Sequence, residues 1–499
     1  NAGILSASRS PMAMSRDGLA SRVESGNLLA GRGHEQWLLS CEEHEPSFAR
    51  DRTARVRPCT LSCRQPMPRT IRSAARSRQT KTIMKNEDYA ALVAMDWGDK
   101  KHTFALRIAA ARSIETGEIS ASAEALHDWL DQLEKRCAGG KVALAIEAGR
   151  NTLLHALLEH PWLEIYPVNP ATSARFRRAF TVSGAKDDGP DAGTLLVLLE
   201  QHRDQLPRLL LDEPLTRELA ALVAARRSAV DQRTDLTNQL RSILKGYFPQ
   251  ALELVGAELA SPLALDFLSR WPELAEVKKA RPASLRAFYA QHNVRRPETI
   301  AERVALIAPA RPFTTDRTVI APAILQVRML IALLRVQQTH IATFAERIAT
   351  VFAAHPEAAF FRELPGAGPT LAPRLLVAFG DRRERFPEAS DLQEYAGVAP
   401  VVEKSGHQKW THWRWQAPKF LRQSFVEWAG QTVVYCDWAH AYYAEQARHG
   451  KAHHTILRGL AFKWIRILWR CWHNHQPYDE QVYLAALKQR HSPLAQLVA

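Results

Sequence analysis

The first regular pattern of hydrophobic and polar positions begins near Ala90, where short apolar runs alternate with helical periodicity. Two stretches have the spacing of helices, 123–133 and 153–158. Around them, several runs have the length and composition of β-strands: 91–95, 102–108, 113–120, 142–146 and 163–168. Apolar strands that alternate with helices predict an α/β domain with a partly parallel sheet.

Two long stretches, 215–247 and 324–352, space their seam residues alternately by three and four positions. This spacing predicts long helices that each bury one seam. Arg226 and Arg233 fall within the first seam, where they could pair with acids, extend along the surface or face phosphates. The proline-interrupted stretch between the helices is also predicted to be helical. We therefore expect a coiled-coil arm or dimerisation element with a helical insertion over 206–355.

The last part of the chain, 356–499, is predicted to be mostly α-helical. The run Leu364-Pro365-Gly366-Ala367-Gly368 resembles the turn of a helix-hairpin-helix, whose backbone amides can hold a DNA phosphate. A plain turn between two helices would use the same residues. Two basic helices follow, and the second interleaves its basic residues with Trp464, Trp469 and Trp472. These tryptophans suit either nucleic-acid stacking or a protein core.

Composition favours a polyanionic partner, because the 499 residues carry a formal net charge of +14. Half of this charge lies in 1–83, which holds 14 Lys/Arg and 7 Asp/Glu and has no sustained periodicity. We interpret this leader as a disordered basic arm or, preferably, as translated sequence upstream of a start at Met84. The six cysteines form no CxxC pair, and no apolar run reaches about 18 residues. These features predict a cytoplasmic protein without a membrane span.

Four acidic residues lie at strand ends or at a helix start, where active sites often form. Asp96 and Glu147 each end an apolar strand, and Asp188 and Asp191 lie three residues apart at a predicted helix start, so they share a helix face. Sites in open α/β sheets form beyond strand ends, and clustered carboxylates suit Mg²⁺. Helix capping would also explain Asp188 and Asp191, and a strand-end acid is often a solvated turn residue.

Over roughly 89–481, this order of features resembles the DEDD transposases of the IS-one-ten (Piv/MooV) family of bacterial insertion sequences. The chain departs from the family pattern at Asp187, at Ala148-Gly149-Arg150 and at Gly189-Pro190. The matching motifs are Met95-Asp96-Trp97-Gly98, Ala145-Ile146-Glu147-Ala148-Gly149, Asn169-Pro170, Asp188-x-x-Asp191-Ala192, Leu364-Pro365-Gly366-x-Gly368, Ala396-Gly397-x-x-Pro400 and Lys404-Ser405-Gly406.

The resemblance implies a RuvC-like domain of RNase H fold over 84–205 and a transposase domain over 356–499. It implies that Asp96, Glu147, Asp188 and Asp191 bind Mg²⁺ and that Ser405 is the nucleophile, forming a phosphoserine. It further implies DNA as substrate, a structured guide RNA, and a homo-oligomer (dimer or tetramer) whose acids and serine come from different subunits. The expected location is the bacterial cytoplasm, in association with the nucleoid.

Two other functions remain open from the sequence. In a RuvC-like structure-specific nuclease, water would be the nucleophile and Ser405 an ordinary turn residue. A non-catalytic nucleic-acid-binding protein descended from such an enzyme would keep the fold without the activity.

Overall fold

The computed structural model describes residues 88–109, 111, 113–147, 152–180, 188–406 and 408–498, so the predicted leader over 1–83 lies outside the described part. The chain divides into two compact units. Among the described residues, the first unit holds 88–214 together with Gly380–Pro387. The second holds Leu215–Phe379 and the residues from Glu388 onward.

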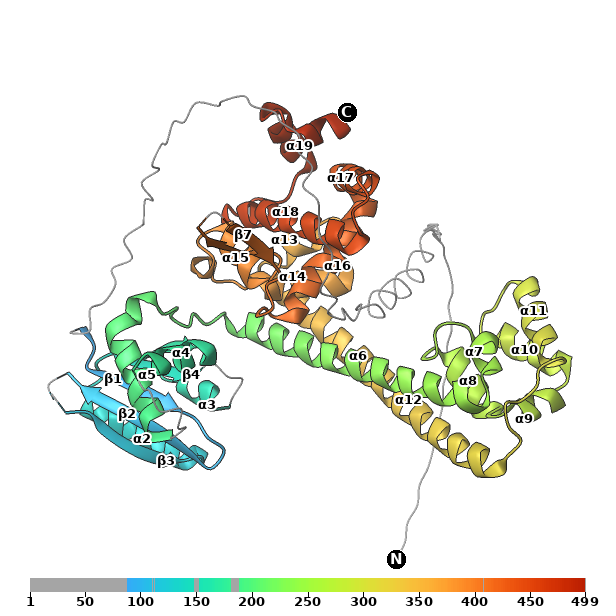
Figure 1. The fold of residues 1–499 in the computed structure, drawn as a ribbon, viewed down its shortest axis with the longest axis horizontal. Helices are drawn as coiled ribbons and strands as arrows, with labels where there is room; N and C mark the ends of the chain where they lie inside the picture. The colour runs from blue at the N-terminus through green and yellow to red at the C-terminus, as the bar shows by residue number, and fades with distance from the viewer. Residues whose placement is uncertain are drawn as a thin grey trace, which may run out of the picture. The chain divides into compact units, whose positions relative to one another are not determined.

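The first unit is built on a five-stranded mixed sheet with the order β3-β2-β1-β4-β5 (Figure 1). β1 pairs antiparallel with β2, and β2 with β3, whereas β4 runs parallel to both β1 and β5. The strands are β1 (Ala91–Asp96), β2 (Lys101–Ile108), β3 (Glu115–Ser120), β4 (Val142–Glu147) and β5 (Leu163–Val168). The prediction of an α/β domain with a partly parallel sheet is confirmed.

Successive side chains along each strand point to opposite faces of the sheet. Both faces are apolar, because apolar residues occupy successive positions of the strands. One face, with Val93 and Met95, packs against α2 (Ala123–Arg136) and α3 (Thr152–Leu157). The other face packs against α5 (Asp188–His202), and its small side chains allow close approach: Ala94, Ala105, Ala143 and Ala145. The remaining helix of this unit, α4 (Pro170–Phe180), follows β5 directly.

A buried glutamate connects several residues at the end of the sheet where the parallel strands begin. Glu164, which is 3% exposed, accepts a 2.6 Å hydrogen bond from the Tyr89 hydroxyl. It also pairs with Lys141 at 3.2 Å and with Arg208 at 3.0 Å. Burial alone would raise the pKa of Glu164, but these hydrogen bonds and positive charges hold it below its ordinary value. The ionised carboxylate thus ties together the residues that precede β1 and β4.

Two long helices, α6 (Pro214–Tyr247) and α12 (Arg317–Ala354), run antiparallel in the second unit. Near the start of α6, Glu218 pairs with Arg347 near the end of α12. Farther along α6, Gln232 accepts a hydrogen bond from Gln337. Most positions of the predicted seam on α12 are buried: Ile324, Val327, Ile331, Leu334, Ile341, Ile348 and Phe352.

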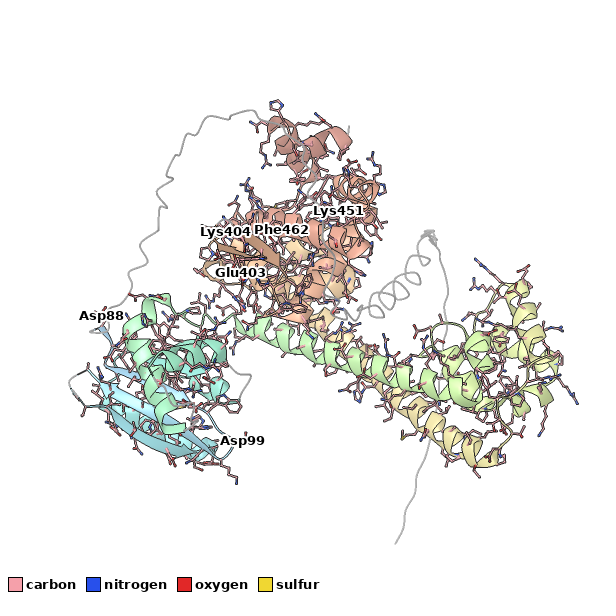
Figure 2. All side chains as sticks on the ribbon, in the orientation of Figure 1. Asp88, Asp99, Glu403, Lys404, Lys451 and Phe462 are labelled. Carbon is pink, nitrogen blue, oxygen red and sulfur yellow. The ribbon has the colours of Figure 1, made fainter. Side chains whose placement is uncertain are left out.

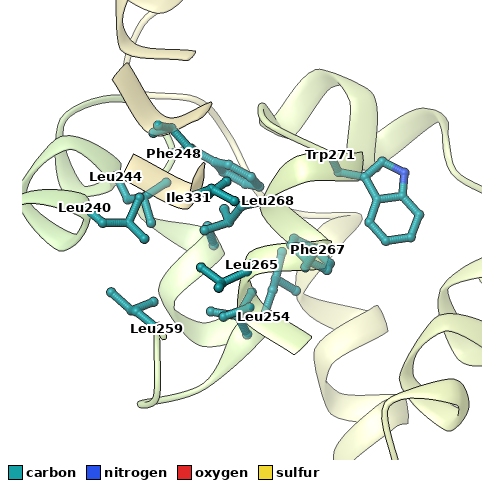
Figure 3. Packing of buried hydrophobic residues seen from close by; sticks show 14 of the residues in the cluster. Leu240, Leu244, Phe248, Leu254, Leu259, Leu265, Phe267, Leu268, Trp271 and Ile331 are labelled. Carbon is teal, nitrogen blue, oxygen red and sulfur yellow. The ribbon is translucent and has the colours of Figure 1, made fainter. Parts of the chain in front are cut away.

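The stretch between the two long helices forms a helical subdomain with a hydrophobic core of its own, seen in Figure 3. Leu240 and Leu244 from α6 and Ile331 from α12 complete this core. Three of its helices begin with proline, which is favourable in the first turn because the missing N–H has no helical partner there. The helices are α7 (Gln250–Val255), α8 (Pro262–Arg270), α9 (Leu274–Lys279), α10 (Pro282–Gln291) and α11 (Pro297–Ile307).

α12 is long and apolar enough, by length and composition alone, to cross a membrane. Its inner face nevertheless belongs to the core of the helical subdomain, through Val327 and Leu330. Outside that core, Arg335 pairs with Asp266 of α8 at 2.6 Å. These contacts favour a helix that packs within the folded unit.

The described residues of the C-terminal part are mostly helical, as predicted, but they also form a β-hairpin that was not predicted from the sequence. Its hairpin consists of β6 (Val401–Ser405) and β7 (Gln408–His412). Its helices are α13 (Ala358–Arg362), α14 (Gly368–Phe379), α15 (Ala389–Tyr395), α16 (Lys419–Tyr435), α17 (Asp437–Arg448), α18 (His453–His473), α19 (Glu480–Gln489) and α20 (Pro493–Leu497).

Tryptophans form the centre of this helical part. Trp464 and Trp472 of α18 are fully buried, and Trp464 donates a 2.8 Å hydrogen bond to the Thr432 hydroxyl. For Trp464 and Trp472 the protein core is therefore the correct interpretation, whereas Trp469 is only partly buried. Nucleic-acid stacking on Trp464 or Trp472 would require α18 to leave its core.

The Leu-Pro-Gly turn between α13 and α14 packs against α16. Trp428 donates a 2.9 Å hydrogen bond to the Pro365 carbonyl. Gly366 has a φ of 69°, and a Cβ at this position would come within 2.9 Å of the Gln431 side chain. Close packing on α16 thus accounts for this glycine.

Replacing Glu164 by Gln keeps the shape of the side chain but removes the charge that three partners share. We expect the free energy of opening the sheet, measured by hydrogen exchange of β5 amides at pH 7, to fall by about 2 kcal/mol. Glu159→Gln, an exposed neighbour, is the control.

The stability that Glu164 contributes should decrease at acidic pH. Because folding lowers the pKa of Glu164, its stabilisation is complete above the unfolded value of about 4.3 and is lost as the pH falls through the folded value. Wild-type stability should therefore decrease more steeply below about pH 4 than that of Glu164→Gln. Equal acid sensitivity of the two proteins would contradict this role.

Candidate active site

Asp96 and Glu147 leave the sheet side by side and line one pocket of 450 Å³. Their proximity follows from the parallel pairing of β1 with β4, in which Met95 lies opposite Ile146. The next residue of each strand is the acid. Thr103 of β2, opposite Asp96 in the sheet, lines the same pocket.

Asp191 of α5 supplies a third carboxylate to this pocket. The helix begins at Asp188, so Asp188 and Asp191 lie one turn apart on it. Pro190 falls within the first turn, where a helix tolerates proline. The i, i+3 spacing predicted for the two acids is therefore kept. The side chain of Asp188 and all of Asp187 lie outside the described part.

Arg177 of α4 enters the same pocket and forms an ion pair with Asp191. The hydrogen bond to Asp191 and its charge raise the pKa of Arg177, and the charges of Glu147 and Asp96 raise it further. Arg177 thus offsets the mutual repulsion of the carboxylates. The sequence shows α4 as basic but contains no sign of this contact across 14 positions.

The remaining walls of the pocket mix a cation, an aromatic ring and a buried hydroxyl. Lys101 lies on one side and pairs with Glu118 at 2.5 Å. Trp97 is 39% exposed, and Ser173 is 8% exposed. The pocket thus places carboxylates next to the cations Arg177 and Lys101.

The donor chemistry of the pocket fits a hard divalent cation, because Asp96, Glu147 and Asp191 offer carboxylate oxygens. Among the described side chains, no group of three Asp, Glu, His or Cys residues is arranged to hold a metal ion. Asp191 is engaged by Arg177. A cation bound through the same carboxylate oxygen would therefore compete with Arg177 for Asp191.

Ser405 does not line this pocket and belongs to the second unit, at the end of β6. It pairs with Gln408 across the hairpin, and Gly406 in the turn has a φ of 57°. That left-handed conformation favours glycine, which allows the tight turn. Figure 2 labels the neighbouring Glu403 and Lys404 on β6.

Both strands of this hairpin are almost entirely exposed, so the Ser405 hydroxyl is accessible. Residues opposite each other, and residues two apart along a strand, share one face of a hairpin. Trp410, which is 49% exposed, therefore lies on the same face as Ser405.

The acid pocket and the hairpin lie in regions that match two transposase families. Residues 93–249 match the DEDD transposases of IS110, and 358–444 match the transposases of the IS116/IS110/IS902 family. The first region contains all four predicted acids, and the second contains Ser405. The chain belongs to the IS110 family of transposases. This confirms the resemblance found in the sequence and indicates an enzyme that acts on DNA.

Two relatives of IS110-type elements come from Streptomyces coelicolor. One, whose name links it to the transposase of the mini-circle element IS117, is 29% identical over 406 residues, which are 79% of this chain and 97% of that protein. The other, an uncharacterized 43.6 kDa protein of the insertion element IS110, is 25% identical over 289 residues, which are 57% of this chain and 70% of that protein.

The competition at Asp191 can be tested with the metal alone. Arg177→Gln removes the cation that competes for this carboxylate, so we expect Mg²⁺ to bind up to about fivefold more tightly by titration calorimetry, because a partly exposed ion pair is weak. Arg178→Gln, an exposed neighbour on α4, should leave Mg²⁺ affinity unchanged. Weaker binding by Arg177→Gln would mean that Arg177 supports the pocket instead of competing for it.

Proposed function

We propose that this transposase cuts and rejoins DNA strands by using the acid pocket of the first unit together with Ser405 of the second. The observation that carries the proposal is the convergence of Asp96, Glu147 and Asp191 in one pocket. The mixed sheet with acids at the ends of β1 and β4 supports a RuvC-like domain of RNase H fold over 84–205. The antiparallel contacts of α6 and α12 support a coiled-coil arm over 206–355, followed by a transposase domain over 356–499.

Asp96, Glu147, Asp188 and Asp191 would hold Mg²⁺ in this proposal. When bound, Mg²⁺ would polarise the scissile phosphate and stabilise charge on the attacking and leaving oxygens. Arg177, once released from Asp191, and Lys101 would be available to a phosphate oxygen as charge-assisted donors.

The Ser405 hydroxyl would attack the phosphorus of a DNA phosphodiester. The Oγ–P bond forms as the P–O3′ bond breaks, the hydroxyl loses its proton, and the departing 3′ oxygen takes one up. The products are a phosphoserine and a free 3′-OH. Because one ester replaces another, the bond energy is kept, and a 3′-OH can reverse the reaction to join a new strand. The exposed end of the hairpin gives Ser405 the necessary access.

We further propose that a structured guide RNA directs the reaction by pairing with donor and target DNA. The support is the family resemblance together with the basic balance of residues 84–499, which carry 52 Lys/Arg against 45 Asp/Glu and so a formal net charge of +7, which suits polyanions. DNA and RNA would then both contact the protein in the bacterial cytoplasm, at the nucleoid.

An exposed apolar stripe on α12 supports a homo-oligomer, either a dimer or a tetramer. The stripe consists of Leu325, Met329, Leu333 and Val336, which are 43–66% exposed in the described structure. Their spacing of four, four and three positions places them on one side of the helix. A contiguous apolar stripe is typical of an association surface, whereas scattered apolar residues are not. The acids and the serine of one site could then come from different subunits.

Covalent capture tests the nucleophile. Wild-type protein incubated with Mg²⁺, its flanking RNA and labelled element-end DNA should form protein–DNA adducts that persist on a denaturing gel. Ser405→Ala and Glu147→Gln should each lose the adduct, by at least about 100-fold, because an activated nucleophile and its charge stabilisation are removed. Thr411→Ala, which removes a hydroxyl from the opposite face of the same hairpin, should keep the adduct.

Each contrary result identifies another function. Strand cleavage that persists in Ser405→Ala would favour a RuvC-like nuclease that uses water. If wild-type protein neither cleaves nor joins DNA with the RNA supplied, a non-catalytic binding protein would be favoured.

Charge on the α12 stripe should weaken self-association. The double substitution Leu325→Glu/Met329→Glu should shift sedimentation velocity toward a smaller species, because a carboxylate in an apolar interface carries a large desolvation penalty. Val482→Glu, at an isolated apolar residue with the same 66% exposure as Leu325, should leave the distribution unchanged. An unaltered oligomer in the double variant would exclude the stripe as the contact surface.

A further inference from the structure

Trp413, the residue that follows β7, is in contact with two arginines that form no ion pair within the described part of the chain. The Arg422 guanidinium carbon, from α16, lies 4.4 Å from the centre of the Trp413 ring. The corresponding atom of Arg458, from α18, lies 4.2 Å from it. We call Trp413, Arg422 and Arg458 the Trp413 cluster. Two cations thus share one indole.

The two positive charges of this cluster disfavour each other. Burial lowers the pKa of Arg422, and burial together with the charge of Arg422 lowers the pKa of Arg458. A cation–π contact offsets only part of this cost. An anion held by both guanidinium groups would remove their repulsion, and the fork of N–H donors on arginine matches phosphate in particular.

An exposed indole lies next to the cluster, and another is on the hairpin that leads to it. Trp415 is 79% exposed, and its ring centre lies 6.5 Å from that of Trp413. Trp410, which shares the Ser405 face of the hairpin, is 49% exposed. An exposed aromatic ring next to paired cations is the combination on which unpaired bases stack while their phosphates are held.

The hairpin links this cluster to Ser405. β7 runs from Gln408, opposite Ser405, to His412, which immediately precedes Trp413. Five residues of extended chain span roughly 17 Å, a length that a short stretch of single strand can follow. A hairpin exposed on both faces has little stability of its own, so a bound strand would also stabilise it.

We propose that the Trp413 cluster and Trp415 form a binding site for single-stranded nucleic acid. Arg422 and Arg458 hold a phosphate, Trp415 stacks an unpaired base, and the strand follows the hairpin toward Ser405. The direction of the strand rests on the proposed function of Ser405, whereas binding itself does not require that chemistry.

The stacking part is tested by fluorescence anisotropy with the full chain and 12-nucleotide oligothymidine or oligouridine probes. Trp415→Ala should bind about 5- to 150-fold more weakly, the range for removal of one base–aromatic stack, and Trp415→Phe should retain most of the affinity. Because Trp415 is largely exposed, neither change should affect folding. Phe313→Ala, at an aromatic residue with 76% exposure elsewhere in the same unit, is the control.

The phosphate part is tested by salt dependence. In Arg422→Gln/Arg458→Gln, the slope of log affinity against log salt should become shallower by about 0.7 for each phosphate that the protein no longer neutralises. Arg448→Gln, at an exposed arginine already paired with Glu445, should leave the slope unchanged. Thermal unfolding of the double variant checks its fold, and Trp415→Ala remains informative if that fold is lost.

The probes distinguish the source of the strand. Weaker binding confined to oligothymidine assigns the site to DNA, weaker binding confined to oligouridine assigns it to RNA, and weaker binding of both supports a site that reads phosphate and base alone. Unchanged affinity of Trp415→Ala for both probes overturns the proposal. Weaker binding by the variants, in a protein that never forms a Ser405 adduct, would refute the proposed function while this site stands. The reverse pattern would refute the site alone.

Discussion

Carboxylates held at one end of a sheet repel one another, and the first unit is arranged around that repulsion. The parallel register of β1 and β4 places Asp96 and Glu147 side by side, and α5 adds Asp191. Such a cluster needs nearby positive charge, because several anions in one partly buried pocket raise the free energy of the folded state. Arg177 supplies that charge. A divalent cation would meet the same need with a greater charge, which makes the pocket suitable for metal-dependent chemistry.

At the opposite end of the sheet, a carboxylate paired with cations contributes to the stability of the fold. There Glu164 is almost completely buried and satisfied by Tyr89, Lys141 and Arg208. Two of these partners precede β1 and β4, and the third follows α5. The carboxylates of the pocket are more accessible. One end of the sheet thus holds a buried carboxylate with several partners, while the other end presents carboxylates to an open pocket.

The second unit carries the complementary charge. Arg422 and Arg458 share one indole, and the neighbouring hairpin presents Ser405 and exposed tryptophans to solvent. Membership of the IS110 family connects the two units, because the acids and the serine fall in its two matched regions. In the proposed function, the anionic pocket would hold the metal, the cationic cluster would bind a phosphate, and the exposed hydroxyl would form the covalent attachment.

The local pattern of apolar and polar residues was enough to predict much of the secondary structure of this protein. Strict apolar runs ending on Asp96 and Glu147 predicted the strands, and residues such as Val327 and Ile331 at spacings of three and four predicted the buried face of α12. These features depend on which side of a strand or helix is apolar, and that information is contained in neighbouring residues. The order of the acids and Ser405 also carried the family resemblance.

Only the tertiary structure decided which residues meet across the chain. Nothing in the sequence pairs Arg177 with Asp191, or places Arg422 and Arg458 on Trp413, because these contacts join separate elements. Trp464 and Trp472 also stayed undecided between a core and a nucleic-acid surface, since an indole suits both, and packing against α16 settled it. The sequence shows which residues are charged or aromatic, but the packing of helices and strands decides which of them are buried and which contact each other.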